Sequence, residues 1–224
     1  MQKYALVSLL SLITWVGHGQ ALSGLGGDSD RIKGKFKFIP LPYVNYDVAT
    51  GFALGAIPLA MFNPSEKDSI SPSSVAGLLG MYTENETWFF MGFGKFYLKE
   101  DRWRITAAAG KGDAKFQFYV NNPIDKWIRY NTNVDFAYLG AQRRLKPNLY
   151  GGLSYIYTSY KTSTDFYTDS AATKLHGIGV SLSYDKRSNV SYPRSGYFIE
   201  LDYTTYLSVF NESNESNQIT LAYN

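Results

Sequence analysis

The chain has 224 residues, of which 45% are hydrophobic, 17% aromatic and only 18% charged, with a formal net charge of +3. This composition excludes a chain that is disordered throughout, and the small net charge gives no indication of a nucleic-acid partner. With no Cys and two His, the sequence also excludes a disulfide scaffold, a thiolate metal site and a His-rich metal site, and no cofactor is expected.

The first residues have the layout of a secretory signal peptide. Lys3 supplies a basic start, residues 4–16 form an apolar run, and residues 17–21 are mostly small. A membrane-spanning helix needs about 20 apolar residues, more than this run provides. We expect a signal peptide over 1–21 and a flexible leader over 22–34; a short buried helix of a cytosolic domain is the alternative. No later segment is long enough for a spanning helix, so the exported protein is secreted, periplasmic or an outer-membrane barrel.

Alternation of apolar and polar residues runs through most of the remaining chain. In the run 174–184, His176, Ile178, Val180 and Leu182 fall on one face, whereas glycines and serines fall on the other. Many runs are longer than ordinary soluble strands of about 5–6 residues and match the 9–11 residues of a transmembrane strand. The predicted strands are 35–48, 51–62, 74–83, 87–98, 102–119, 132–145, 149–161, 174–187, 197–209 and 218–224.

These strands predict an all-β chain, folded as a transmembrane antiparallel up-and-down β-barrel over 35–224 with a polar, glycine-rich lumen. Tight connections are predicted to alternate with long ones. The tight ones are 49–50, 84–86, 147–148 and 189–196, and the long ones are 63–73, 120–131, 162–173 and 211–217. The last run is short and ends in Asn224, which favours a fragment of a larger barrel over a small complete one.

The segment 177–203 reads GIGVSLSYDKRSNVSYPRSGYFIELDY. Its Asp185, Arg187, Pro193 and Gly196 match a turn motif, Asp-x-Arg followed by Pro-x-x-Gly, and only Ser188 departs from the frequent Asp. This motif, together with segments 38–56 and 143–152, resembles the bacterial surface antigen family, the barrel domain shared by BamA and TamA.

The resemblance implies a sixteen-stranded outer-membrane barrel of a Gram-negative bacterium, of which this chain covers about the first ten strands. It further implies a role in outer-membrane protein or lipid handling, with the outer-membrane lipid bilayer and other outer-membrane or periplasmic proteins as partners. The family's periplasmic POTRA repeats and its Arg-Gly lumen loop have no counterpart in the sequence. The functional expectation therefore depends on fold relatives alone.

The turn motif has a physical interpretation of its own. Asp185 and Arg187 share the parity of the glycine-rich face, so both are expected to point into the lumen and to bridge charges on neighbouring strands. Pro193 presets φ in the turn and Gly196 permits a positive φ. We interpret the motif as structural, with a partner contact at the periplasmic rim as the alternative. Further candidate lumen or rim charges are Arg102, Arg104, Arg143, Glu200 and Asp202.

Catalysis is not expected. A catalytic nucleophile would need a base beside it, but His176, the one His beyond the predicted signal peptide, falls on the apolar, lipid-facing side. The inward carboxylates Glu200 and Asp202 resemble pairs that line many lumens. The alternatives are a small complete porin-like or structural barrel, an outer-membrane enzyme, and a secreted β-sandwich binding module.

Overall fold

The computed structural model describes residues 36–47, 50–120, 125–164, 172–190, 193–207 and 216–223; the predicted signal peptide (1–21) and leader (22–34) lie outside them. Ten strands are formed: β1 (Phe36–Asp47), β2 (Gly51–Phe62), β3 (Ser74–Thr83), β4 (Trp88–Leu98), β5 (Trp103–Val120), β6 (Lys126–Lys146), β7 (Leu149–Thr164), β8 (Ala172–Asp185), β9 (Phe198–Tyr206) and β10 (Ser216–Tyr223). In this described part of the chain, no helix has the length and apolar character needed to cross a membrane.

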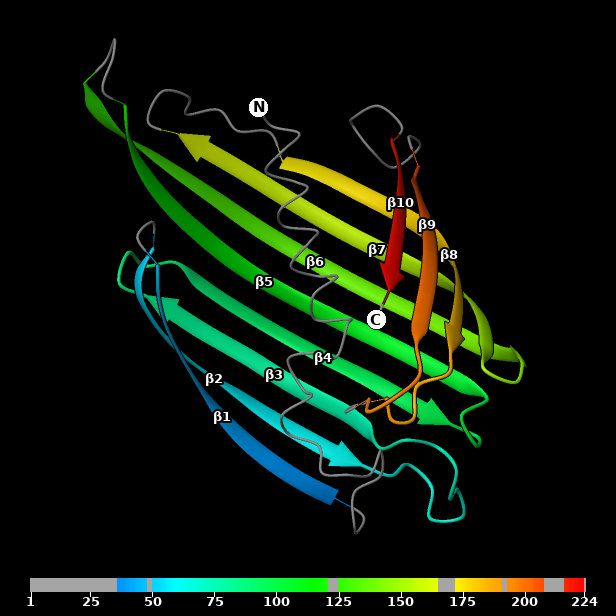
Figure 1. Ribbon diagram of the computed structural model, residues 1–224. Coiled ribbons are helices and arrows are strands. Elements are labelled where there is room, and N and C mark those ends of the chain that lie inside the picture. Colours follow the sequence, from blue (N-terminus) through cyan, green and yellow to red (C-terminus); the bar gives the residue numbers. More distant parts are fainter. Residues whose placement is uncertain are drawn as a thin grey trace.

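All ten strands belong to one sheet, in which each strand pairs antiparallel with the next in chain order. The sheet is strongly curved, and β1 and β10 lie on its two edges (Figure 1). The predicted all-β meander of ten strands is thereby confirmed, and the predicted strands 51–62 and 74–83 coincide with β2 and β3.

One strand is much longer than its apolar pattern predicts. β6 begins at Lys126 rather than at 132, so most of the predicted connection 120–131 is strand. The pairing of β5 with β6 runs without interruption from Trp103↔Arg143 to Val120↔Lys126. The added part of β6 is rich in polar residues, so backbone pairing with β5 holds it as a strand although it carries no apolar alternation.

Tight and long connections were predicted to alternate along the chain. In the structure they do not sort into one end of the sheet with tight connections and one with long connections. The long connection 63–73 and the tight hairpin at 147–148 lie at the same end, because β2 finishes and β7 begins there. That end also holds the β4–β5 turn and the connection from β8 to β9. We call it the Arg104 end, after the second residue of β5.

The two faces of the sheet differ as the period-two pattern predicts. On β8, Ile178, Val180 and Leu182 are about half exposed, whereas Ser183 and Asp185 are buried on the opposite face. The exposed apolar face, here called the outer face, extends over the other strands; it includes Phe52, Leu54, Leu78, Tyr82, Phe90, Leu139, Leu153, Tyr155, Leu201 and Tyr203. His176 lies on this face, as predicted, with Nδ1 2.7 Å from the Tyr155 hydroxyl.

The inner face is less polar than expected. Leu59, Met61 and Met91 are buried on it, and farther along the sheet Ile156 and Leu175 join Tyr206 in a buried apolar cluster. Because the sheet curves, inner side chains from several strands meet and remove apolar area from water, which stabilises the curved form. The polar, glycine-rich lumen that was predicted for the whole barrel therefore does not describe β2 to β4.

Candidate functional site

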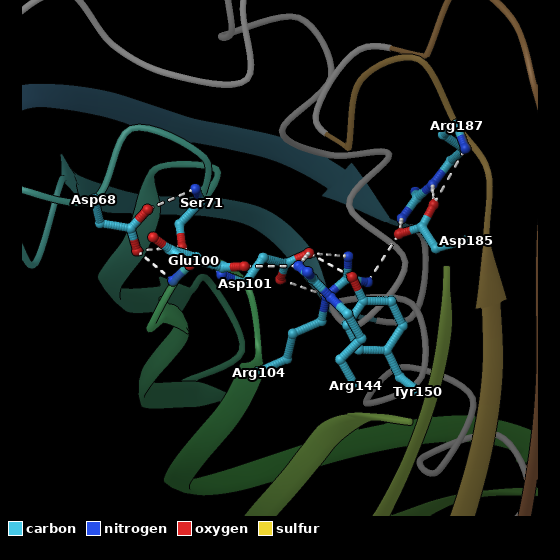
Figure 2. A network of polar contacts seen from close by, with 9 residues as sticks. All are labelled: Asp68, Ser71, Glu100, Asp101, Arg104, Arg144, Tyr150, Asp185 and Arg187. Carbon is cyan, nitrogen blue, oxygen red and sulfur yellow. Dashed lines mark hydrogen bonds and ion pairs between the residues drawn. The ribbon is translucent and has the colours of Figure 1, made fainter. Parts of the chain in front are cut away.

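A cluster of buried charges lies on the inner face at the Arg104 end. We call the six residues that form it the Arg104 cluster: Asp101, Arg104, Arg144, Tyr150, Asp185 and Arg187 (Figure 2). They come from the β4–β5 turn, from strand ends of β5, β6, β7 and β8, and, for Arg187, from the β8–β9 connection. The cluster thus joins segments spread over more than 80 residues of sequence.

Arg104 is the centre of the cluster. Its Nε and Nη2 donate to Asp101 Oδ1 and Oδ2, both at 2.8 Å, which is the two-bonded fork geometry that a guanidinium forms best. Its Nη1 donates to Asp185 Oδ2, also at 2.8 Å. The Arg104 side chain is only 6% exposed, so its charge is desolvated and depends on both carboxylates.

Asp185 is held from a second side by Arg187. The Arg187 Nε and Nη2 donate to Asp185 Oδ1 and Oδ2 at 2.8 and 2.9 Å, and the Arg187 guanidinium lies 4.4 Å from the Phe198 ring centre. Asp185 is buried on the inner face, and Arg187 pairs with it from the connection that follows β8.

The partner of this pair is not on a neighbouring strand, however. Arg104 lies on β5, and β6 and β7 separate it from β8. Three strand spacings would amount to about 14 Å in a flat sheet. A 2.8 Å contact between Arg104 and Asp185 is possible because the inner face is concave.

Aromatic rings complete the surroundings of Arg104. Its guanidinium carbon lies 3.7 Å from the centre of the Tyr150 ring and 5.6 Å from that of Tyr97. The Tyr150 hydroxyl donates to Asp101 Oδ2, so one residue of β7 contacts both members of the Arg104–Asp101 pair. Such stacking of a desolvated cation on rings adds to the ion pairing.

The turn that carries Asp101 is held in an unusual backbone conformation. Lys99, Glu100 and Asp101 all have positive φ values, between 53° and 59°. A non-glycine residue in this region costs of the order of 1–3 kcal/mol, so three in succession need support from their surroundings.

The connection 63–73 supplies this support. Asp68 Oδ2 accepts a hydrogen bond of 2.7 Å from the Glu100 backbone N–H, and Ser71 Oγ accepts one of 2.7 Å from that of Asp101. The Ser71 hydroxyl in turn donates to Asp68 Oδ2 at 2.6 Å. The connection between β2 and β3 therefore fixes the direction in which the Asp101 carboxylate points.

Asp68 remains ionised in this position. Burial alone would raise its pKa, but hydrogen bonds from the Ser71 hydroxyl and from the backbone N–H groups of Ser71, Glu100 and Ile70 outweigh burial. The pKa of Asp68 falls from 3.8 to about 2 as a result. The carboxylate therefore accepts these hydrogen bonds at any pH near neutrality.

The arrangement is that of a structural clamp. Three guanidiniums and two carboxylates share a site in which Arg144 also donates to the Glu100 carbonyl at 2.7 Å and lies 3.4 Å from Asp101 Oδ2. The donors and acceptors of the cluster are engaged with one another. In the described residues, no group of three or more His, Asp or Glu is arranged to hold a metal ion.

The other predicted charges do not form one patch. Arg102 and Arg143 lie outside the cluster: Arg102 is 68% exposed and 3.7 Å from Glu100, whereas Arg143 is on the outer face over the Trp103 ring. Glu200 is on the inner face and accepts a 2.9 Å hydrogen bond from Gln142 Nε2. Asp202 is half-buried on the same face of β9. Only Arg104 among the five joins the turn motif.

The two turn residues of the motif shape the connection from β8 to β9. Pro193 is exposed in this connection. Gly196 has a φ of +94°, as predicted, and a Cβ added there would lie 2.0 Å from the Lys186 carbonyl oxygen. Glycine is therefore required at this position for the chain to pass Lys186 and enter β9.

Sequence reasoning missed Asp68, Ser71, Asp101 and Tyr150. Asp68 and Ser71 have the spacing of an Asx turn, which predicts a local hydrogen bond but not a contact with another turn. Asp101 is only three residues from Arg104, but it lies in a turn, where alternation does not predict which way a side chain points. Nothing local to Tyr150 identifies Arg104 as its partner, because β6 separates β5 from β7 and the contact depends on the curvature of the sheet.

A scan against protein-family models and searches of the curated proteins and of the solved structures each found no match.

Proposed function

We propose that this chain forms the wall of a transmembrane β-barrel of the bacterial surface antigen type, in the outer membrane of a Gram-negative bacterium. The observation that carries the proposal is the two-faced sheet: an outer face of exposed apolar side chains opposes an inner face on which charges are buried and paired. Export would depend on a signal peptide over residues 1–21.

The outer face is difficult to reconcile with an aqueous surrounding. Soluble monomers rarely expose contiguous apolar patches beyond a few hundred Å². On β8 and β9 together, Ile178, Val180, Leu182, Leu201 and Tyr203 are each 40–50% exposed and adjacent across the register Val180↔Tyr203 and Leu182↔Leu201. Contact with lipid removes this cost, since lipid chains are as apolar as the side chains.

Strand length supports the same proposal. A transmembrane strand needs about 9–11 residues at its usual tilt. Nine of the ten strands reach or exceed this length, from the 9 residues of β9 to the 21 of β6, and β10 has 8.

The edges of the sheet indicate how the wall would be completed. Backbone groups in lipid must all be paired, so β1 and β10 need strand partners within a membrane. The resemblance of Asp185, Arg187, Pro193 and Gly196 to the family motif favours completion by further strands, to sixteen in all. A small barrel closed by β1 against β10 is the other outcome that the experiment below distinguishes.

A role in outer-membrane protein or lipid handling follows from the same resemblance. The Arg104 cluster supports it only indirectly, because it is a clamp that keeps a wide wall curved rather than a site for chemistry. Substrates and partner proteins would therefore bind to the surface of the barrel rather than to a catalytic site within it.

The test is to produce the full chain in a Gram-negative host and to separate the membranes on a density gradient. We expect the protein in the outer membrane, shortened by residues 1–21, with heat-dependent gel mobility. The mass of the membrane-embedded protein decides between the two barrels: the mass of this chain without residues 1–21 indicates a small barrel, and a larger mass indicates further strands. Depleting it in its own cell should lower the amounts of other outer-membrane proteins or alter lipid composition. Recovery as a soluble periplasmic protein would contradict the proposal.

A further inference from the structure

A basic concavity opens on the outside of the sheet at the Arg104 end. It has a volume of about 560 Å³ and lies between the β4–β5 turn and the β6–β7 hairpin. Its lining includes Lys99, Arg102, Trp103, Arg143, Leu145 and Lys146, and we call it the rim pocket. The backbone N–H of Arg144 donates to the Arg102 carbonyl at 2.9 Å, which ties its two walls together.

The cations of the rim pocket outnumber the carboxylates near them. Arg102 is 3.7 Å from Glu100 and has one exposed carboxylate as its partner. Within the described part of the chain, no carboxylate lies at ion-pair distance from Lys99, Arg143 or Lys146. Several unneutralised cations around one hollow attract an anion with several oxygen acceptors, of which a phosphate is the best match.

The position of the pocket indicates what kind of molecule carries this phosphate. Trp103 and Arg143 are directly opposed in the β5–β6 register, with the Arg143 guanidinium 5.7 Å from the Trp103 ring centre. Both lie where the apolar outer face ends. A Trp beside cations at this level is typical of the boundary between lipid chains and headgroups.

A second hollow, which is apolar, lies farther along the outer face. It has a volume of about 380 Å³, and Phe96, Ala107, Leu139 and Tyr155 are among the residues that line it. Ala107 is four positions after Trp103 on β5, which corresponds to about 13 Å along the strand. A molecule with a phosphate at one end and a hydrocarbon chain at the other fits the two hollows together.

We propose that the rim pocket and this apolar hollow bind one anionic phospholipid, with its phosphate among Lys99, Arg143 and Lys146 and an acyl chain against Ala107 and Leu139. The binding would hold the Arg104 end at a defined depth in the bilayer. This inference rests on the proposed placement of the outer face in a membrane.

Tryptophan fluorescence can report on the pocket, because Trp103 forms part of it. The full chain is folded into vesicles of phosphatidylcholine and phosphatidylglycerol after replacement of Trp15, Trp88 and Trp127 by Phe. Bromine on the acyl chains of one lipid at a time quenches a nearby Trp. We expect brominated phosphatidylglycerol to quench Trp103 more strongly than its fraction of the vesicle lipid alone would give. A chain in which Trp88 is the one remaining Trp should show no such preference.

Removing the cations identifies their contribution. In the Trp103 chain, the triple variant Lys99→Gln, Arg143→Gln and Lys146→Gln should lose the preference, with an affinity that falls about fivefold for each cation. All three side chains are exposed, so the triple variant should still fold.

A matched control removes the same charge from elsewhere. Lys111, Lys161 and Lys174 are exposed and lie outside the rim pocket. Their replacement by Gln lowers the net charge equally and should leave the preference at Trp103 unchanged.

The outcomes separate this inference from the proposed function. No quenching of Trp103 or Trp88 by either brominated lipid would show that the chain does not enter the bilayer, and both proposals would fail. Quenching by both lipids in proportion to their amounts would leave the membrane placement intact and overturn the lipid site. Loss of the preference on addition of inorganic phosphate alone, at matched ionic strength, would assign the pocket to free phosphate and also overturn it.

Discussion

Arg104 Nη1 lies 2.8 Å from Asp185 Oδ2 and joins β5 to β8 across two intervening strands. Both side chains are almost fully buried, at 6% and 3% exposure. A buried ion pair contributes little net free energy once desolvation is counted, but losing one partner leaves a charge without compensation. The pair therefore makes the curvature of the sheet a condition for stability.

Replacing either partner should destabilise the fold strongly. We expect Arg104→Gln and Asp185→Asn each to lower the free energy of unfolding by about 3–5 kcal/mol, because each removes one partner of a buried pair. Urea titration of the chain folded in lipid vesicles, followed by Trp fluorescence, measures this. The matched control is Arg102→Gln, which breaks an exposed contact and should cost less than about 1 kcal/mol. Equal effects of Arg102→Gln and Arg104→Gln would contradict the account.

A methyl group at Gly196 should disturb the same clamp from the β8–β9 connection. The Gly196→Ala variant places a Cβ 2.0 Å from the Lys186 carbonyl oxygen at a φ of +94°, so we expect a loss of about 1–3 kcal/mol or more. Gly80→Ala serves as the control, since the nearest atom to its Cβ is 3.8 Å away. A similar stability of the two variants would show that the connection is free to rearrange.

How far the sequence predicts this molecule depends on the range of each interaction. Period-two alternation identifies β8 because side chains on one strand alternate between faces whatever the rest of the chain does. The positive φ of Gly196 is equally local. The length of β6 and the partner of Asp185 are not local, since one depends on pairing with β5 and the other on the curvature of the whole sheet. Arg104 was a candidate charge, but only the fold distinguishes it from Arg102.

The support from the connection 63–73 should depend on pH through Asp68. Its pKa is lower in the folded chain, about 2 against 3.8, so the folded state binds fewer protons than the unfolded state. Its contribution to stability is complete above about pH 4 and is lost as the pH falls towards 2. Urea titrations of the native chain and of Asp68→Asn should differ at pH 7 and converge near pH 2. A constant difference over this range would be the contrary result.

At neutral pH the Ser71 hydroxyl should support the turn through its own hydrogen bond from the Asp101 backbone N–H. Ser71→Ala leaves the Asp101 N–H without its acceptor, which should cost about 1–3 kcal/mol and increase hydrogen exchange at that amide. Ser69→Ala, in the same connection but exposed, should change neither quantity. If exchange at Asp101 is the same in both variants, the connection does not support the turn.

A charge should be tolerated on one face of β8 and not on the other. Val180→Lys places an ammonium on the outer face, where it should cost about 2–4 kcal/mol near the middle of a bilayer. Ser181→Lys points inward, opposite Asp202 in the β8–β9 register, and should be nearly neutral. The fraction of each variant that acquires heat-dependent gel mobility after refolding into vesicles measures the difference. Equal insertion of the two would argue against a lipid-facing outer face.

The central claim, that the outer face contacts lipid while the inner face does not, can be tested along β9. The chain has no Cys, so single cysteines at Ile199, Glu200, Leu201, Asp202, Tyr203 and Thr204 carry a nitroxide label without interference. The account predicts that oxygen dissolved in the bilayer relaxes the labels at 199, 201 and 203, and that a water-soluble nickel complex does not reach them. The labels at 200, 202 and 204 should be shielded from lipid. Equal access of the nickel complex to all six positions would contradict the claim.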